Sequence, residues 1–255
     1  MDKPLILVTN DDGITAPGIR ALVEVARELG EVCVVAPDSP QSGMGHAITI
    51  KDPIRLRKAR TFEGIEAYEC SGTPVDCVKL ANNIVFKNRK PDLCVSGINH
   101  GSNASLNILY SGTMSAAMEA SMEGINSIGF SLLNYAYDAD FQPAQPFIRQ
   151  IMAYVLQNDM QSTKLLNVNI PALPGPELKG IRVCRQAEAR WKEEFVESTD
   201  PRGQKYYWMT GVFINEDRGE DTDIWALENG YLSVVPSGHD LTSYAAIPEF
   251  RRMEQ

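Results

Sequence analysis

Apolar runs alternate with amphipathic stretches along most of the chain. The short apolar runs fit strands buried on both faces of a parallel sheet, which we predict over residues 4–9, 31–37, 91–97, 125–132 and 165–171. Between them, apolar side chains recur at helical spacing, which predicts helices over residues 18–30, 73–86, 113–124 and 144–159. Thr73 and Pro74 suit the N-cap and the first position of the second helix.

This alternation predicts an α/β fold with a Rossmann-like, mostly parallel sheet and helices on both of its faces. Two shorter strands are predicted within residues 53–58 and 66–74, as an excursion from the main alternation of strands and helices.

From residue 185 onward the pattern changes. Charged and aromatic residues alternate up to residue 215, which favours a long hairpin arm over another βαβ unit. Such an arm cannot bury its apolar side chains alone, so we expect it to pack on a partner subunit. A short helix, a strand and an irregular or helical tail follow at 222–230, 231–236 and 239–255. We therefore divide the chain into a core (1–185) and a second part (186–255) made of the arm and the C-terminal segment.

The composition and net charge of the chain limit the classes of function that fit it. The chain has 255 residues, 44% apolar and 22% charged, which suits one large globular domain. A net charge of −9 argues against binding to nucleic acid polymers or anionic membranes. The first residues lack a signal-peptide pattern, no apolar run approaches the roughly 20 residues of a membrane span, and five scattered cysteines fit reduced core positions. These features predict a cytoplasmic protein.

Polar, glycine-bearing loops follow three of the predicted strands. Asn10, Asp11 and Asp12 follow the first, residues 39–45 follow the second, and residues 96–103 follow the third long one. Each loop alone fits an ordinary solvated turn. Because ligands of open α/β sheets bind at the carboxyl ends of the strands, the coincidence of the three loops predicts a site.

The residue types at this site suit a hard cation. Two carboxylates, Asp11 and Asp12, with neutral oxygens from Ser42 and Asn99 would make an oxygen shell for Mg²⁺, Mn²⁺ or Ca²⁺. Zinc is less favoured, because no His or Cys cluster has the spacing of zinc ligands.

A helix start in the same region could hold an anion. Ser111, Gly112 and Thr113 precede or begin a helix of small residues, and its N–H groups and dipole suit phosphate, although an ordinary N-cap fits them as well. A cation shell beside such a helix points to phosphate ester chemistry. The chain lacks a P-loop lysine motif and a GxGxxG after its first strand. His100, and less directly His46, could donate a proton to a leaving oxygen.

Seven motifs occur in an order that resembles the SurE family of survival protein E nucleotidases. They are TNDDG (9–13), APDSPQSGMGHAIT (36–49), GTPVDCV (72–78), SGINHGSN (96–103), YSGTMSAAMEA (110–120), LNVNIP (166–171) and KYYWMTG (205–211). Near the C-terminus, DLTSY (240–244) carries Ser243 where the family often has an aspartate.

The resemblance implies a Rossmann-like 5′-nucleotidase, a phosphoric monoester hydrolase of nucleoside 5′- and 3′-monophosphates, with a possible side activity on short polyphosphate. It implies one divalent cation per subunit, Mg²⁺ or Mn²⁺, and a homodimer or homotetramer formed through an exchanged arm. Carried over by motif, the metal ligands are Asp11, Asp12, Ser42 and Asn99, of which Asp11 and Asp12 are also catalytic. The phosphate-side residues are Asn10, Gly43, Ser111, Gly112 and Thr113.

Two other functions remain open from the sequence. A nucleoside hydrolase also uses aspartates after its first strand to hold a hard cation, although it carries a longer run of them. A non-catalytic, regulatory protein that binds nucleotide and metal could use the same scaffold. A dehalogenase-type phosphatase would need a DxDx[TV] strand end, which TNDDG does not supply.

Overall fold

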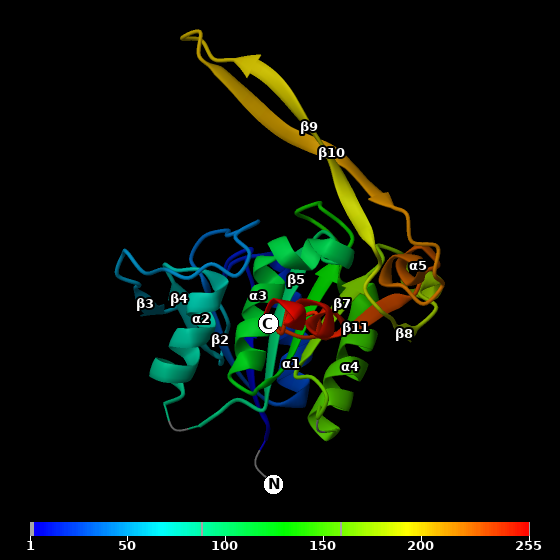
Figure 1. Cartoon of the computed structure of the whole chain (residues 1–255). Coiled ribbons are helices and arrows are strands. Elements are labelled where there is room, and N and C mark those ends of the chain that lie inside the picture. Colours follow the sequence, from blue (N-terminus) through cyan, green and yellow to red (C-terminus); the bar gives the residue numbers. More distant parts are fainter. Residues whose placement is uncertain (1–2, 88, 159, 255) are drawn as a thin grey trace.

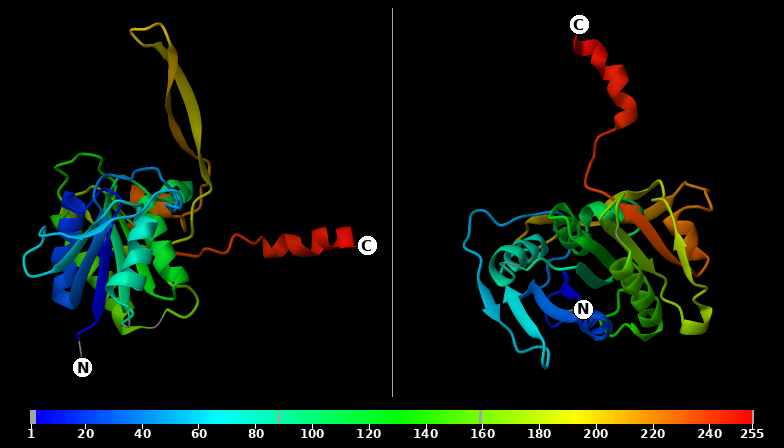
Figure 2. Two further views of the ribbon diagram at one scale, coloured as in Figure 1. Left: turned by 90° about the vertical axis from the view of Figure 1, so that its left-hand side faces the viewer. Right: turned by 90° about the horizontal axis from the view of Figure 1, so that it is seen from below.

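A computed structural model describes residues 3–87, 89–158 and 160–254 of the chain (Figure 1). Residue 159, the last one predicted for the fourth helix, lies outside these ranges. An α/β body carries a long hairpin that projects from it, and the C-terminal segment extends from the body in another direction (Figure 2). Within the described residues, no helix is both long enough and apolar enough to cross a membrane.

A nine-stranded sheet forms the centre of the described body. Its strands are β1 (Leu5–Thr9), β2 (Glu31–Pro37), β3 (Leu56–Lys58), β4 (Glu66–Cys70), β5 (Leu93–His100), β6 (Asn126–Leu132), β7 (Leu165–Ile170), β8 (Ile181–Val183) and β11 (Leu232–Ser237). They lie in the order β3-β4-β2-β1-β5-β6-β7-β11-β8. All neighbours pair in parallel except β3 with β4 and β7 with β11. The predicted mostly parallel sheet is confirmed.

Helices cover both faces of the sheet, as predicted. They are α1 (Pro17–Leu29), α2 (Pro74–Leu80), α3 (Gly112–Met122), α4 (Gln145–Gln157) and α5 (Asp223–Glu228), whereas α6 (Ile247–Phe250) lies in the C-terminal segment that extends from the body. Because side chains alternate along a strand, Ile6 and Val8 of β1 pack with α1 and α4, whereas Leu7 packs with α2 and α3. Shorter 3₁₀ helices occupy Ser105–Tyr110, Gln142–Ala144, Gly175–Glu177, Tyr244–Ala246 and Arg251–Glu254. All five cysteines are unpaired and buried, which confirms them as core residues.

The predicted helix over residues 73–86 is confirmed only in its first half as an α-helix. The Thr73 hydroxyl accepts the N–H of Asp76, the Asp76 carboxylate accepts the N–H of Thr73, and Pro74 begins the helix. After Leu80 the chain continues as a π-helical turn, Ala81–Val85. The apolar residues that predicted a continuous helix do not report on this change, because only Ala81 of the π-helical turn is buried.

The chain returns to the sheet after the hairpin. β11, within the predicted strand 231–236, pairs with β7 on one side and with β8 on the other. The boundary predicted at residue 185 therefore assigns β11 to the same part as the arm, although β11 belongs to the nine-stranded sheet of the body. The sequence did not predict β8, because it has only three residues and two of them are exposed.

The predicted hairpin arm is confirmed. It consists of β9 (Ala189–Thr199) and β10 (Lys205–Asn215), which pair antiparallel along their whole length (Figure 1). Large apolar side chains on it are exposed, namely Phe195, Val196, Tyr207, Trp208, Met209 and Val212. Exposed apolar patches of this kind mark interaction surfaces, so packing of the arm on a partner subunit stays a prediction.

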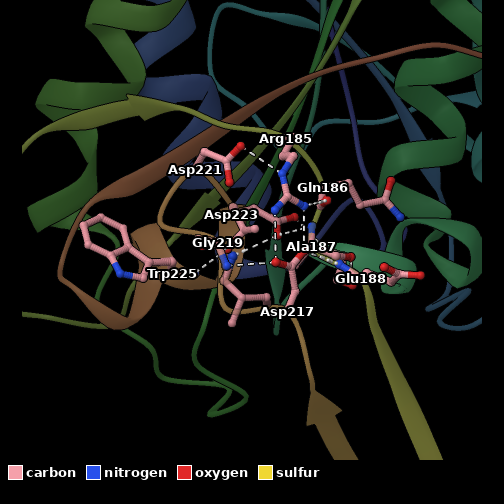
Figure 3. Close-up of polar contacts among 12 residues, drawn as sticks. Arg185, Gln186, Ala187, Glu188, Asp217, Gly219, Asp221, Asp223 and Trp225 are labelled. Carbon is pink, nitrogen blue, oxygen red and sulfur yellow. Dashed lines mark hydrogen bonds and ion pairs between the residues drawn. The ribbon is translucent and has the colours of Figure 1, made fainter.

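Charged side chains hold the root of the arm (Figure 3). The Arg185 guanidinium donates to both carboxylate oxygens of Asp217, at 2.6 and 3.0 Å, and to Asp221 at 2.9 Å. This guanidinium holds the pKa of Asp217 well below its usual range. These ion pairs thus fix the place at which the two strands of the arm leave the body.

Asp223 joins the arm root to the loop that leads into α3. Its buried carboxylate accepts the backbone N–H of Ala187 at 2.9 Å and that of Ser105 at 2.8 Å. The indole N–H of Trp191 on the arm also donates to Asn107 at 2.8 Å. The orientation of the arm is therefore linked to residues 105–110, which immediately precede Ser111.

Candidate active site

The candidate site lies where the strand order reverses. β1 sits between β2 and β5, so the chain winds outward from β1 in both directions, and this arrangement opens a crevice at the carboxyl ends of β1 and β5. The backbone N–H of Gln41 donates to the Asp11 carbonyl at 2.7 Å. Asp12 and His100 line the same pocket. The three polar loops therefore meet at this edge.

Asp11 points to the start of α3. Its side chain is almost fully buried, and it accepts the hydroxyl and the backbone N–H of Thr113. Burial, followed by the neighbouring charge of Asp12, raises the pKa of Asp11 to about 6, although the donors on Thr113 oppose this change. A β-carbon on Gly112 would lie 2.7 Å from the Asp11 β-carbon, so only glycine fits at this close approach.

Asp12 is half-buried and lines a pocket of about 300 Å³. Burial raises the pKa of Asp12, whereas the His100 imidazole and backbone N–H lower it. Asp38, Tyr135 and His100 line the same pocket. The two consecutive carboxylates thus have different surroundings, because Asp11 is held at the start of α3 and Asp12 borders this pocket.

Buried polar atoms without a partner gather around these carboxylates. They are Thr9 Oγ1, Asn10 Oδ1, Asp12 Oδ2, Ser96 Oγ and His100 Nε2, all at or just beyond the carboxyl ends of β1 and β5. Most buried polar groups of native proteins are hydrogen-bonded. This concentration of unpaired atoms, most of them oxygens, therefore indicates that a polar ligand completes the site.

The remaining predicted cation ligands lie at the edge of the site. The Asn99 side chain is half-buried and donates its amide to the Gly101 carbonyl at 3.0 Å, so its oxygen is the atom that can bind a cation. Ser42 and Gly43 are exposed, on a turn fixed on either side by the Gln41–Asp11 bond and by the bond from the Gly45 N–H to the Tyr110 carbonyl.

The predicted phosphate-side residues of α3 lie directly against Asp11. Ser111 caps the helix, since its hydroxyl oxygen accepts the Met114 N–H at 3.0 Å, and its own proton can still donate. Asn10 gives one amide proton to the Gly13 carbonyl at 2.9 Å and retains a second. Donors for an anion are thus available beside the carboxylate pair.

A hard divalent cation fits this donor set. The polar atoms are mainly carboxylate, amide and hydroxyl oxygens, the ligands preferred by Mg²⁺ and Mn²⁺. Within the described residues no group of three or more His, Cys, Asp or Glu side chains could hold a metal ion, so Asp11 and Asp12 would need neutral oxygens beside them. The unpaired Asp12 Oδ2 is one atom that such a cation would satisfy.

The family model for "Survival protein SurE" matches residues 6–193 of the chain. The chain belongs to the SurE family. A 5′-nucleotidase SurE from Cytophaga hutchinsonii is 61% identical over 99% of this chain and 97% of its own. One from Bacteroides thetaiotaomicron is 48% identical over 97% and 95%. The crystal structure of the SurE protein from Aquifex aeolicus superposes with a TM-score of 0.85 at 40% identity, over 99% of this chain and 100% of that one. The resemblance inferred from the motifs is confirmed.

The two candidate histidines of this SurE-family chain have different surroundings. His100 donates from Nδ1 to the Ala136 carbonyl at 2.8 Å, which leaves Nε2 as the atom at the site. His46 instead forms an ion pair with Glu119, at 2.9 Å between Nε2 and Oε2. This contact favours an anchoring role for His46.

Sequence reasoning missed Glu119. Its carboxylate is almost fully buried on α3 and binds Lys79 of α2 on one oxygen and His46 on the other. It therefore fastens the loop that carries Ser42 to the helix that holds Asp11. The signal in the sequence is one acidic residue among the small and apolar residues of MSAAMEASM.

We expect Glu119→Gln to lower the free energy of unfolding by about 1–3 kcal/mol, since it removes charged hydrogen bonds from a buried group. Denaturant unfolding measures this change. Glu123→Gln is the matched control, because Glu123 is exposed at the end of the same helix. Equal stability of the two variants would contradict the anchoring role.

Proposed function

We propose that the protein is a divalent-metal-dependent 5′-nucleotidase that hydrolyses nucleoside 5′- and 3′-monophosphates to nucleoside and phosphate. The observation that carries the proposal is the set of unpaired buried polar atoms beside Asp11 and Asp12 at the switch point of the sheet. The names of the relatives support the substrate class. Short polyphosphate is a further substrate within the proposal.

One cation per subunit, Mg²⁺ or Mn²⁺, would be held by Asp11, Asp12, Ser42 and Asn99. When bound, it supplies positive charge that polarises a phosphoryl oxygen and makes water a stronger nucleophile at neutral pH.

The chain's own residues orient the reactants. Asp11 is held by Thr113 and accepts a proton from the attacking water. The second amide proton of Asn10 and the hydroxyl proton of Ser111 donate to the phosphate oxygens, together with the backbone N–H groups of Gly43 and Gly112.

His100 supplies the proton that the leaving oxygen needs. Because Nδ1 is committed to the Ala136 carbonyl, the proton is carried on Nε2 of the imidazolium. His100 and Asp12 line the same pocket. His46 is a second candidate for this role, although its pairing with Glu119 favours anchoring.

We further propose that the protein works in the cytoplasm as a homodimer or homotetramer. Exposed apolar side chains along the arm support an interface between subunits. The net charge of −9 supports a small substrate rather than a nucleic acid polymer or a membrane surface.

The proposal predicts metal-dependent phosphate release from nucleoside monophosphates. Released phosphate and released base are measured together, with Mn²⁺, with Mg²⁺ and with EDTA. We expect phosphate with either metal and a loss of at least about 100-fold with EDTA, because the cation is needed to neutralise the carboxylate pair. Free base would instead identify a nucleoside hydrolase, and metal binding without any turnover would identify a regulatory binding protein.

A further inference from the structure

We propose that the pocket beside Asp12 binds the nucleobase of the substrate, with Tyr135 as its stacking surface and Tyr137 and Asp38 as further walls. This inference rests on the proposed nucleotidase function and adds a residue that selects the substrate. It is carried by the position of two exposed tyrosines on the rim of a pocket that a site carboxylate also lines.

The pocket has the size and position for one ring system. Its volume is about 300 Å³, at the lower end of the range for small-molecule sites. Asp12 lines it, whereas the neighbouring Asp11 faces the start of α3. A phosphate held beside Asp11 and Ser111 would therefore direct the rest of the nucleotide past Asp12 and into this pocket.

The charge of the pocket selects a neutral group that carries N–H donors. Asp12 and Asp38 both line it, and two carboxylates disfavour a second phosphate there. Ser39 donates to one Asp38 oxygen at 3.1 Å, which leaves the other oxygen as an acceptor. The amino and imino groups of nucleobases are donors that match this acceptor.

The aromatic surface is fixed before ligand binds. A β-carbon on Gly101 would lie 2.3 Å from the Tyr135 ring, so the ring lies directly against the backbone at Gly101, whose φ of +111° favours glycine. The segment that carries the ring is held by the bond from His100 to the Ala136 carbonyl and by the bond from the Ala136 N–H to Asn134, at 2.9 Å. A fixed ring loses little entropy when a base stacks on it.

Much of the Tyr135 side chain nevertheless remains free for a ligand. Tyr135 and Tyr137 are each 78% exposed, among the most exposed large side chains of the body. Stacking on an aromatic ring is independent of base identity, since every base has a π-face. The pocket therefore accounts for recognition of nucleotides as a class, with Asp38 favouring bases that present N–H donors.

The test compares substrates with and without a base. AMP and ribose 5-phosphate are assayed with wild-type protein, Tyr135→Ala, Tyr135→Phe and the control Tyr154→Ala, which alters an exposed tyrosine of α4. We expect Tyr135→Ala to lower kcat/KM for AMP about 10-fold through a higher KM. Activity on ribose 5-phosphate should change less than about 2-fold, Tyr135→Phe should retain stacking, and Tyr154→Ala should behave as wild type.

Calorimetric binding of AMP and of ribose 5-phosphate separates this inference from the proposed function. If wild-type protein hydrolyses neither compound, the nucleotidase proposal fails, and the binding data still decide on the base pocket. An equal change for both compounds, or no change for either, in Tyr135→Ala would overturn the inference. A selective loss of AMP binding would support it.

Discussion

Asp11→Asn should abolish metal-dependent phosphate release and leave the fold intact. We expect kcat to fall by about 10³-fold or more, because the substitution removes a charge that binds the cation and the group that accepts the proton from water. Asparagine is isosteric with aspartate, so its oxygen can still accept the Thr113 hydroxyl. Phosphate release and circular dichroism, measured on the same preparation, check both parts of this expectation.

Two further variants sharpen the assignment of Asp11. Asp11→Glu should also be inactive, since the close approach of Gly112 leaves no room for another methylene group. Asp52→Asn, which changes an exposed aspartate outside the site, should keep full activity. Full activity of Asp11→Asn with the metal still bound would show that Asp11 has neither role, and calorimetric titration with Mn²⁺ measures that binding.

Much of the fold could be predicted from the sequence because its strands are buried on both faces and its helices carry clear apolar stripes. The strand at residues 4–9 and the helix at 18–30 are found as β1 and α1, within a residue or two at each end. β8 could not be predicted in this way, because three residues carry no periodicity. The insertion of β11 between β7 and β8 also has no local signal, since pairing of distant strands depends on the whole sheet.

The topology of the chain was enough to predict which loops form the candidate site, but not the contacts that their side chains make. The rule on carboxyl ends of strands placed the loops of Asp12, Gln41 and His100 together. The hydrogen bond from Gln41 to Asp11 and the pocket shared by Asp12 and His100 confirm that these loops meet. The hydrogen bond from Thr113 to Asp11 could not be predicted, because it depends on the approach of α3 to the end of β1. The pairing of Glu119 with Lys79 and His46 was equally hidden, since these partners lie 40 and 73 residues away in sequence.

These unforeseen contacts give the site a consistent design. α3 is fixed at its start by Asp11 and further along by Glu119, and the loop that carries Ser42 is fixed to both. Rigid support of this kind keeps the carboxylates of Asp11 and Asp12 adjacent. A flexible loop would instead let them move apart and so reduce their repulsion. The proposed catalytic function would therefore be obtained at a cost in stability.

That cost predicts an unusual dependence of stability on pH in metal-free protein. The pKa of Asp11 is about 6 in the folded state against 3.8 in the unfolded state, so the folded state binds the proton more tightly. The contribution of Asp11 to stability is therefore favourable below pH 4 and is lost as pH rises to about 6. At 1.36 kcal/mol for each pKa unit, this loss amounts to about 3 kcal/mol at neutral pH.

Asp11→Asn should remove this pH dependence, because asparagine does not titrate. Without metal, the variant should match wild type near pH 4 and exceed its free energy of unfolding by up to about 3 kcal/mol at pH 7, as measured by urea denaturation. Mn²⁺ should then stabilise the wild type and have little effect on the variant, since a cation that binds only the folded state raises its stability. Parallel curves for the two metal-free proteins between pH 4 and 7 would contradict the raised pKa. A metal response that survives in Asp11→Asn would mean that the cation is held without Asp11.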